Sequence, residues 1–235
     1  MKKIICFLGS VIMVFPGVFS QTSNTLTTDE KKQGWVLLFD GITSKGWTTT
    51  SGNPVPAGWT IMNGCLSTRG ENAGDIITIN QFSDFELSLD YKIEPGSNSG
   101  VKYFFSNYET GGKLGMEFQI IDDNLGEDTR QSNHRCGSFY DVFPPDESKK
   151  RLNPPGEWNN IRIVSYRKKV EHWLNGEKIL ESTRGDKAFT DAVAKSKFSK
   201  TVPAFGTVEK GNILLQEHGG EVSFRNIKIR ELTER

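Results

Sequence analysis

The strongest constraint on the fold is a strict alternation of apolar and polar residues over positions 85–93. Apolar side chains occupy the odd positions of this segment and polar side chains the even ones. Successive side chains of a β-strand point to opposite faces of a sheet, so the pattern predicts a strand with one buried face.

Similar short segments recur along the chain, separated by glycine, proline, asparagine and aspartate. Asn63-Gly64 and Asn175-Gly176 predict hairpin turns, because both residue types accept a positive φ. The expected strands cover residues 36–39, 59–62, 65–68, 75–80, 85–93, 100–106, 115–121, 158–166, 170–174, 177–182, 212–217 and 221–229. We therefore predict an all-β fold of two antiparallel sheets packed face to face.

One segment departs from this pattern. Residues 186–195 are rich in alanine, carry apolar residues near helical spacing and begin with Asp186. They predict one short surface helix. Residues 139–155 contain four prolines and predict a long irregular loop, a kind of segment that often carries function.

The first twenty residues have the pattern of a secretory signal peptide. Lys2 and Lys3 precede an apolar run over 4–15, which is short for a membrane-spanning helix, and Pro16-Gly17 ends the run. The alternative is an uncleaved N-terminal anchor. We expect a signal peptide over 1–20, a flexible lead-in over 21–32 and one domain over 33–235. The mature chain would then be exported to the periplasm or beyond, without a membrane span.

Charge and motifs exclude several classes of function. Lys and Arg total 29, as do Asp and Glu, so no strong positive field favours a nucleic acid partner. No GxGxxG or GxxxxGK[ST] motif indicates a nucleotide cofactor, and no GxSxG motif indicates a serine nucleophile. No HxH, HExxH or CxxC spacing marks a local zinc site, although distant residues that converge leave a divalent metal ion open.

Two cysteines remain once the predicted signal peptide is removed. Cys65 and Cys136 would either form one disulfide, as exported proteins permit, or remain as two small buried thiols. The sequence does not decide between these alternatives, because it does not show whether the pair is within reach.

Two predicted strands each place hydrogen-bonding side chains in line on one face. Glu117 and Gln119 share a face of one strand, and Gln216 and His218 share a face of another. Amides suit sugar hydroxyls, and a carboxylate with an imidazole can move protons. His134 lies in a polar loop near the Glu117 strand. The alternative is that these residues form an ordinary solvent-exposed face.

Several ordered segments together resemble a known family. They are WVLLFDG at 35–41, GW at 46–47, FELSLDY at 85–91, NSG at 98–100, EFQIID at 117–122, GEWN at 156–159, WLNG at 173–176, LQEHGG at 215–220 and the strand at 222–229. This set resembles the 3-keto-disaccharide hydrolase family, also described as 3-keto-glucoside lyase/hydratase domains. The resemblance implies a concanavalin A-like jelly-roll sandwich, exported by bacteria that degrade sugars, which cleaves glycosides already oxidised at C3.

The chemistry implied by this resemblance needs a base and an acid. A C3 ketone acidifies the proton on C2, a base removes it, and the glycosidic oxygen leaves from C1 with help from an acid. Elimination, hydration or both would complete the reaction, and a divalent metal ion could polarise the ketone. We expect Glu117 and His134 as the catalytic residues. We expect the sugar-positioning residues to be Gln119, Asp122, Tyr140, His172, Gln216 and His218.

Other functions fit the same fold. A retaining glycoside hydrolase needs two carboxyl groups about 5–5.5 Å apart. Related glucanases carry acids at E-x-D-x-x-E, but Gln119 replaces the middle acid here. Asp122 lies five positions after Glu117, and therefore on the opposite face of a regular strand. A bulge would be needed to bring the two together. A non-catalytic carbohydrate-binding module and a cell-surface interaction domain are the remaining alternatives.

Overall fold

The computed structural model describes residues 23–70, 72–109, 112–126 and 128–233. The expected signal peptide over 1–20 lies outside the described residues. Within the described ranges, no helix is both long enough and apolar enough to cross a membrane.

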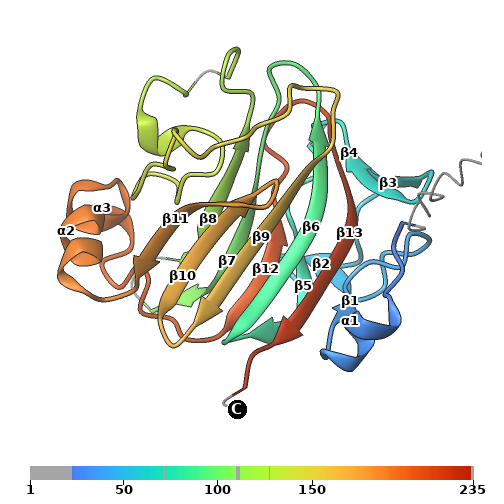
Figure 1. The fold of residues 1–235 in the computed structure, drawn as a ribbon, viewed down its shortest axis with the longest axis horizontal. Coiled ribbons are helices and arrows are strands. Elements are labelled where there is room, and N and C mark those ends of the chain that lie inside the picture. The colour runs from blue at the N-terminus through green and yellow to red at the C-terminus, as the bar shows by residue number, and fades with distance from the viewer. Residues whose placement is uncertain (1–22, 71, 110–111, 127, 234–235) are drawn as a thin grey trace, which may run out of the picture.

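Two antiparallel sheets pack face to face, which confirms the predicted sandwich (Figure 1). The large sheet has the strand order β11-β10-β9-β6-β13-β4-β3, and β1 also pairs with β13. The small sheet has the order β2-β5-β12-β7-β8, so β8 forms one of its edges. The large sheet contains β1 Val36–Leu37, β3 Trp59–Met62, β4 Cys65–Thr68, β6 Phe85–Ile93, β9 Asn159–Tyr166, β10 Lys169–Leu174, β11 Glu177–Thr183 and β13 Val222–Glu231. The small sheet contains β2 Trp47–Thr49, β5 Ile76–Phe82, β7 Asn98–Tyr108, β8 Gly112–Ile121 and β12 Gly211–Leu215.

The apolar face of each strand forms the core between the sheets. β6 places its five odd-numbered residues there, as the alternation predicted, and β8 contributes Met116, Phe118 and Ile120. Burial of these side chains supplies the main driving force for packing one sheet on the other. The opposite face of β8, which carries Glu117 and Gln119, therefore points away from the core.

Both predicted hairpin turns are present. Asn63 and Gly64 have φ of 52° and 72°, and Asn175 and Gly176 have φ of 47° and 88°. Positive φ at both central residues matches the twist of a two-residue hairpin. The turns join β3 to β4 and β10 to β11, with Met62 paired to Cys65 and Leu174 to Glu177.

The described residues form more helices than the single one that the sequence predicted. The helix α2, Lys187–Lys195, confirms that prediction, and the Asp186 side chain caps its N-terminus. The described residues also form α1 Thr28–Lys32, α3 Phe198–Thr201 and a 3₁₀ turn at Ser132–His134. Figure 1 shows α2 and α3 together beside the β11 edge. β2 was not predicted either.

Residues 23–32 are held to the fold by hydrogen bonds, although most of them are exposed. Thr27 and Glu30 form a capping box at the start of α1. The Asn24 backbone N–H donates to the Asn226 side chain at 2.7 Å, and the Asn24 amide donates to the Gly64 carbonyl at 2.8 Å. The sequence predicted a flexible lead-in over 21–32; in its described part, α1 and the Asn24 contacts connect residues 23–32 to the fold.

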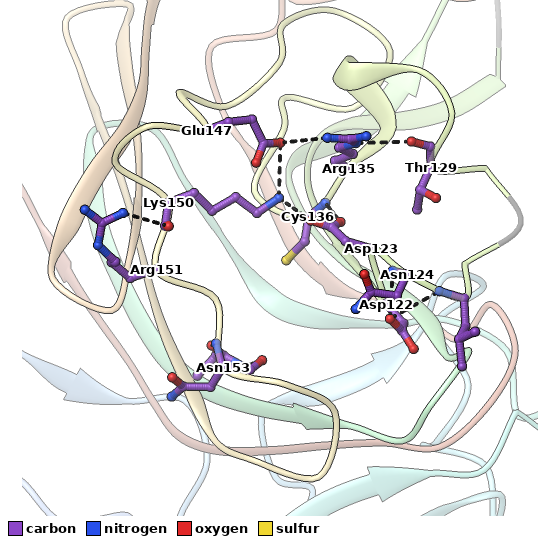
Figure 2. A network of polar contacts seen from close by, with 12 residues as sticks. Asp122, Asp123, Asn124, Thr129, Arg135, Cys136, Glu147, Lys150, Arg151 and Asn153 are labelled. Carbon is purple, nitrogen blue, oxygen red and sulfur yellow. Dashed lines mark hydrogen bonds and ion pairs between the residues drawn. The ribbon is translucent and has the colours of Figure 1, made fainter.

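A buried ion pair fixes the long irregular loop to the end of β8. Lys150 contacts Asp123 and Glu147 (Figure 2). The Lys150 side chain is only 4% exposed. Asp123 also accepts a hydrogen bond from the Cys136 backbone at 2.8 Å. This network holds the chain on both sides of Tyr140 against the small sheet.

Both described cysteines are free thiols. Cys136 is buried and lies 3.1 Å from the Tyr91 hydroxyl, whereas Cys65 begins β4 and is half-buried. Burial raises the pKa of the Cys136 thiol to about 11. The alternative of two unpaired thiols, left open by the sequence, is therefore the one that the structure contains.

Substituting Lys150 tests the buried ion pair. Lys150→Ala is expected to lower the free energy of unfolding by about 3 kcal/mol, because Asp123 loses its buried cation. Urea unfolding followed by circular dichroism measures the change. Lys149→Ala is the control, because Lys149 pairs with Asp146 at an exposed position and should matter by less than about 1 kcal/mol. Equal losses in the two variants would contradict the role given to Lys150.

Candidate functional site

Three neighbouring strands of the small sheet bring polar side chains together on its outer face. Lys102 of β7 pairs with Glu117 of β8, and Gly100 pairs with Gln119. Gln216 follows β12, and its backbone N–H donates to the Gly100 carbonyl at 2.9 Å. These residues surround a cavity of about 230 Å³. Its lining comprises Asn98, Lys102, Leu114, Glu117, Gln119, Tyr140, Lys197, Phe198, Gln216 and His218.

Glu117 is a buried carboxylate with two polar neighbours. It is 7% exposed, and Oε2 lies 3.6 Å from Lys102 Nζ. The hydrogen-bond partners assign the Gln216 amide so that its nitrogen donates to Glu117 Oε1 at 3.3 Å and its oxygen accepts from Lys102 Nζ at 3.0 Å. Gln216 thus bridges the Glu117 carboxylate and the Lys102 ammonium and fixes their relative position.

Gly100 provides the space that the carboxylate occupies. A Cβ on this residue would collide with the Glu117 carboxylate and would lie 3.1 Å from the Gln216 amide group. Its φ is outside the left-handed region, so an alanine is compatible with the local backbone. Glycine is required here for close approach and not for backbone conformation.

The surroundings of Glu117 tune its acidity. Burial raises the pKa of the carboxyl above its ordinary value of 4.5, and the positive charges of Lys102, Lys197 and His218 only partly oppose the shift. A carboxylate whose pKa is shifted toward neutrality is better suited to take a proton than an exposed one. The site therefore contains a candidate general base.

Residues 137–140 run along the edge of β8 and bring Tyr140 to the cavity. The Tyr140 backbone N–H donates to the Glu117 carbonyl at 3.1 Å, and Gly137 donates to the Gln119 carbonyl at 2.9 Å. The Tyr140 hydroxyl donates to Asp128 at 2.8 Å and accepts from Lys197 Nζ at 3.2 Å. Burial, followed by the nearby Asp128 carboxylate, raises the pKa of Tyr140, so its hydroxyl stays protonated.

His134 lies behind Tyr140 and does not line the cavity. Its ring packs on the Tyr140 ring with centroids 4.6 Å apart. Its Nε2 lies 2.8 Å from Asp141, and its Nδ1 lies 2.6 Å from Asp128. Asp141 in turn accepts from the Lys197 backbone at 2.7 Å. The sequence predicted His134 beside Glu117, but the structure does not place it there; His134 instead joins the Tyr140 loop to the segment before α3.

Asp122 lies outside the cavity, contrary to its expected contact with the sugar. Its carboxylate accepts from the backbone N–H groups of Gly96 at 2.9 Å, Asn124 at 2.9 Å and Leu125 at 3.3 Å. Figure 2 shows Asp122 beside Asn124. Although burial acts in the other direction, these hydrogen bonds lower its pKa. Asp122 therefore stabilises the turn after β8.

His172 is a core residue and does not reach the cavity either. Its side chain is fully buried, 2.9 Å from the Tyr103 hydroxyl and 3.1 Å from the Gly137 carbonyl. Burial lowers the pKa of His172 to about 4, so the imidazole is neutral at neutral pH. Its position in β10 turns it toward the small sheet, where no sugar can reach it.

Five of the eight predicted site residues do line the cavity, namely Glu117, Gln119, Tyr140, Gln216 and His218. The cavity also contains two lysines, Lys102 and Lys197, that were not predicted. Lys102 could have been found by extending the strand alternation to 98–108, because it falls on the same face as Gly100. Lys197 had no such signal, because its position depends on how the segment between α2 and α3 packs.

A larger cavity of about 430 Å³ lies beside α2 and α3. Its walls are mostly apolar and include Phe189, Val193 and Phe205. The smaller cavity combines a buried carboxylate, amides, an imidazole and two ammonium groups. We therefore assign the chemistry to the smaller cavity.

The cavity side chains do not fit a resident divalent metal ion. Among the residues that the structure describes, no cluster of three or more His, Cys, Asp and Glu side chains could hold one. The Lys102 ammonium lies beside the Glu117 carboxylate, where a cation would have to bind.

A cavity that combines a buried carboxylate with amides, an imidazole and ammonium groups has the features of an enzyme active site. The model of the family described as a 3-keto-alpha-glucoside-1,2-lyase-like domain matches residues 34–230. The chain therefore belongs to this family of sugar-cleaving enzymes.

Individual relatives support this assignment. A 3-keto-disaccharide hydrolase from Bacteroides thetaiotaomicron is 33% identical over 232 residues, which cover 85% of this chain and 79% of that protein. A crystal structure of a proposed glycosyl hydrolase from Parabacteroides distasonis has a TM-score of 0.80 at 31% identity and covers 90% of this chain and 100% of that one. A second structure from the same organism has a TM-score of 0.67 at 28% identity, with coverage of 84% and 99%.

Gly100→Ala tests the arrangement of the site. The added methyl group is expected to displace the Glu117 carboxylate and to lower kcat/KM on a 3-keto-disaccharide by about 100-fold, because a shift of about 1 Å suffices for such a loss. The melting temperature should change little, because the cavity has room for side-chain movement. Wild-type activity in this variant would show that the carboxylate position is not critical.

Proposed function

We propose that this enzyme cleaves glycosides oxidised at C3 by removing the C2 proton and expelling the glycosidic oxygen from C1. The observation that carries the proposal is the buried Glu117 carboxylate beside the Lys102 ammonium. A base and a cation on one wall match the two needs of the first step, which are proton removal and stabilisation of an enolate.

Glu117 takes the proton in this scheme. The C2–H electron pair forms a C2–C3 double bond, and the carbonyl electrons move to the C3 oxygen as an enolate. Lys102 donates to that oxygen and stabilises its charge. Gln216, which contacts both side chains, maintains their separation as the charge moves.

The enolate then collapses to restore the ketone. The C1–O bond breaks, a C1–C2 double bond forms, and the departing oxygen takes a proton. His218 lines the cavity from an exposed position and is the candidate donor. Addition of water across the C1–C2 double bond completes net hydrolysis, and C2 receives a solvent-derived proton through Glu117 after the carboxyl group has exchanged its proton with water.

The alternative of a retaining glycoside hydrolase has less support. That mechanism needs two carboxyl groups on either side of the scissile bond. Within the described part of the chain, Glu117 is the one carboxylate that lines the cavity, and Asp122 is engaged by backbone N–H groups. A binding module without catalysis would not require a buried carboxylate with a raised pKa.

We also propose that the chain is exported. The support lies in the sequence, where two lysines precede a short apolar run that ends at Pro16-Gly17. A sugar-cleaving activity outside the cytoplasm is consistent with this pattern.

Glu117→Gln tests the central role of the carboxylate. The amide cannot take a proton, so kcat/KM on a 3-keto-disaccharide should fall by at least about 100-fold. Product formation followed by NMR measures the loss. Glu177→Gln, at an exposed residue that starts β11, is the control and should retain full activity. Cleavage by Glu117→Gln at the wild-type rate would remove Glu117 from the mechanism.

The pH dependence tests the coupling of Glu117 to Lys102. Glu117 acts as the deprotonated form, so kcat/KM should rise with pH through a pKa above 4.5. Lys102 opposes the raised pKa, so Lys102→Met should move this rise to higher pH as well as lower the maximal rate. Lys45→Met, at an exposed lysine outside the cavity, should leave the profile unchanged. A shift to lower pH in Lys102→Met would contradict the coupling.

A further inference from the structure

Two amide oxygens in the cavity wall lack hydrogen-bond partners. Gln119 Oε1 and Asn98 Oδ1 are buried, and within the described part of the chain neither accepts a hydrogen bond. Gln119 is only 2% exposed. Buried acceptors of this kind are rare, because each loses its contact with water without compensation. An unpaired acceptor at a cavity wall indicates that a ligand supplies the missing donor.

The two amides lie next to the reacting groups along the sheet. Gln119 is two residues from Glu117 on the same face of β8, a separation of about 6.8 Å. Asn98 lies on the same face of β7, two residues before Gly100, and Gly100 pairs with Gln119. Both side chains line the cavity that contains Glu117 and Lys102. The cavity therefore has a charged end and an amide end.

The two ends suit different parts of an oxidised sugar. A ketone oxygen only accepts hydrogen bonds, so it pairs with the Lys102 ammonium and not with an amide oxygen. A hydroxyl group donates, and it can satisfy Gln119 or Asn98. The terminal torsion of an amide side chain has a broad, shallow energy profile, so each oxygen can turn toward a hydroxyl without leaving its rotamer.

We infer that Asn98 and Gln119 form a hydroxyl-binding pair that orients the substrate, with its C3 ketone toward Lys102 and its unoxidised hydroxyl groups toward the amides. The inference rests on the proposed function for the position of the ketone. It adds a specificity determinant for neutral, polyhydroxylated substrate groups at a distance from the bond that breaks.

Near-isosteric variants separate ligand binding from folding. Gln119→Met and Asn98→Leu remove the unpaired oxygens and keep the side-chain volume close to the original. Removing an unpaired buried acceptor should leave the melting temperature of the free protein unchanged or raise it. The same variants should bind a 3-keto-disaccharide about tenfold more weakly each, because a hydrogen bond to the sugar is lost.

Titration calorimetry in the Glu117→Gln background measures this affinity without turnover. Gln81→Met is the matched control, because Gln81 is an exposed amide on β5 that pairs only with Asn212 among the described residues. A series of 3-keto-disaccharides that lack single hydroxyl groups completes the test. At least one of these deoxy compounds should bind the Glu117→Gln parent more weakly than the complete disaccharide does. The same compound and the complete disaccharide should bind equally well to the Gln119→Met or the Asn98→Leu derivative of that parent.

The outcomes distinguish this inference from the proposed function. Unchanged affinity in both variants would overturn the hydroxyl-binding pair, even if the wild-type enzyme cleaves the substrate. A loss of affinity together with a melting temperature several degrees lower would also overturn it, because the amides would then be structural. Failure of the wild-type enzyme to cleave any 3-keto-glycoside would reject the proposed function, whereas the binding series would still report on the pair.

Discussion

The site depends on burying the Glu117 carboxylate while a neighbouring cation keeps it from being fully protonated. Glu117 lies over Gly100, within reach of the Lys102 ammonium and of the Gln216 amide. Burial alone would favour the protonated acid, and a close cation alone would keep the carboxyl group a weak base. The combination leaves a carboxylate whose pKa is raised. In the proposed mechanism, the same cation stabilises the charge that develops on the substrate.

The rest of the fold places these groups. The pairing of β7 with β8 sets Lys102 opposite Glu117, and the core beneath them fixes both strands. The loop that continues along the β8 edge brings Tyr140 over the site, and His134 with its two aspartates joins that loop to the residue before α3. In the proposed mechanism, a ketone next to the C–H bond makes one carboxylate a sufficient base, whereas a retaining glycosidase needs two.

The sequence predicted the sheets well because local patterns define them. The alternation over 85–93 and the two Asn-Gly turns correspond closely to β6 and to the hairpins. The same parity placed Glu117, Gln119, Gln216 and His218 in one cavity. His172 lies on the predicted strand, but its side chain faces the core, where it pairs with Tyr103 and Gly137. The sequence alone does not distinguish a buried polar residue with such partners from one that contacts a ligand. Tertiary contacts between distant segments determine the positions of Lys197, His134 and residues 23–32. The periodicity of the sequence does not reveal such contacts.

The fate of the C2 hydrogen is the most direct test of this account. The wild-type enzyme would be given a 3-keto-disaccharide in D₂O, and early product would be analysed by NMR and mass spectrometry, with the free 3-keto sugar incubated alone to measure spontaneous exchange. Proton removal at C2 predicts that the original C2 hydrogen is lost from every product molecule and that hydrated product carries deuterium there. Product that keeps its original C2 hydrogen would show direct displacement at C1 and would contradict the role of Glu117 as a carbon base.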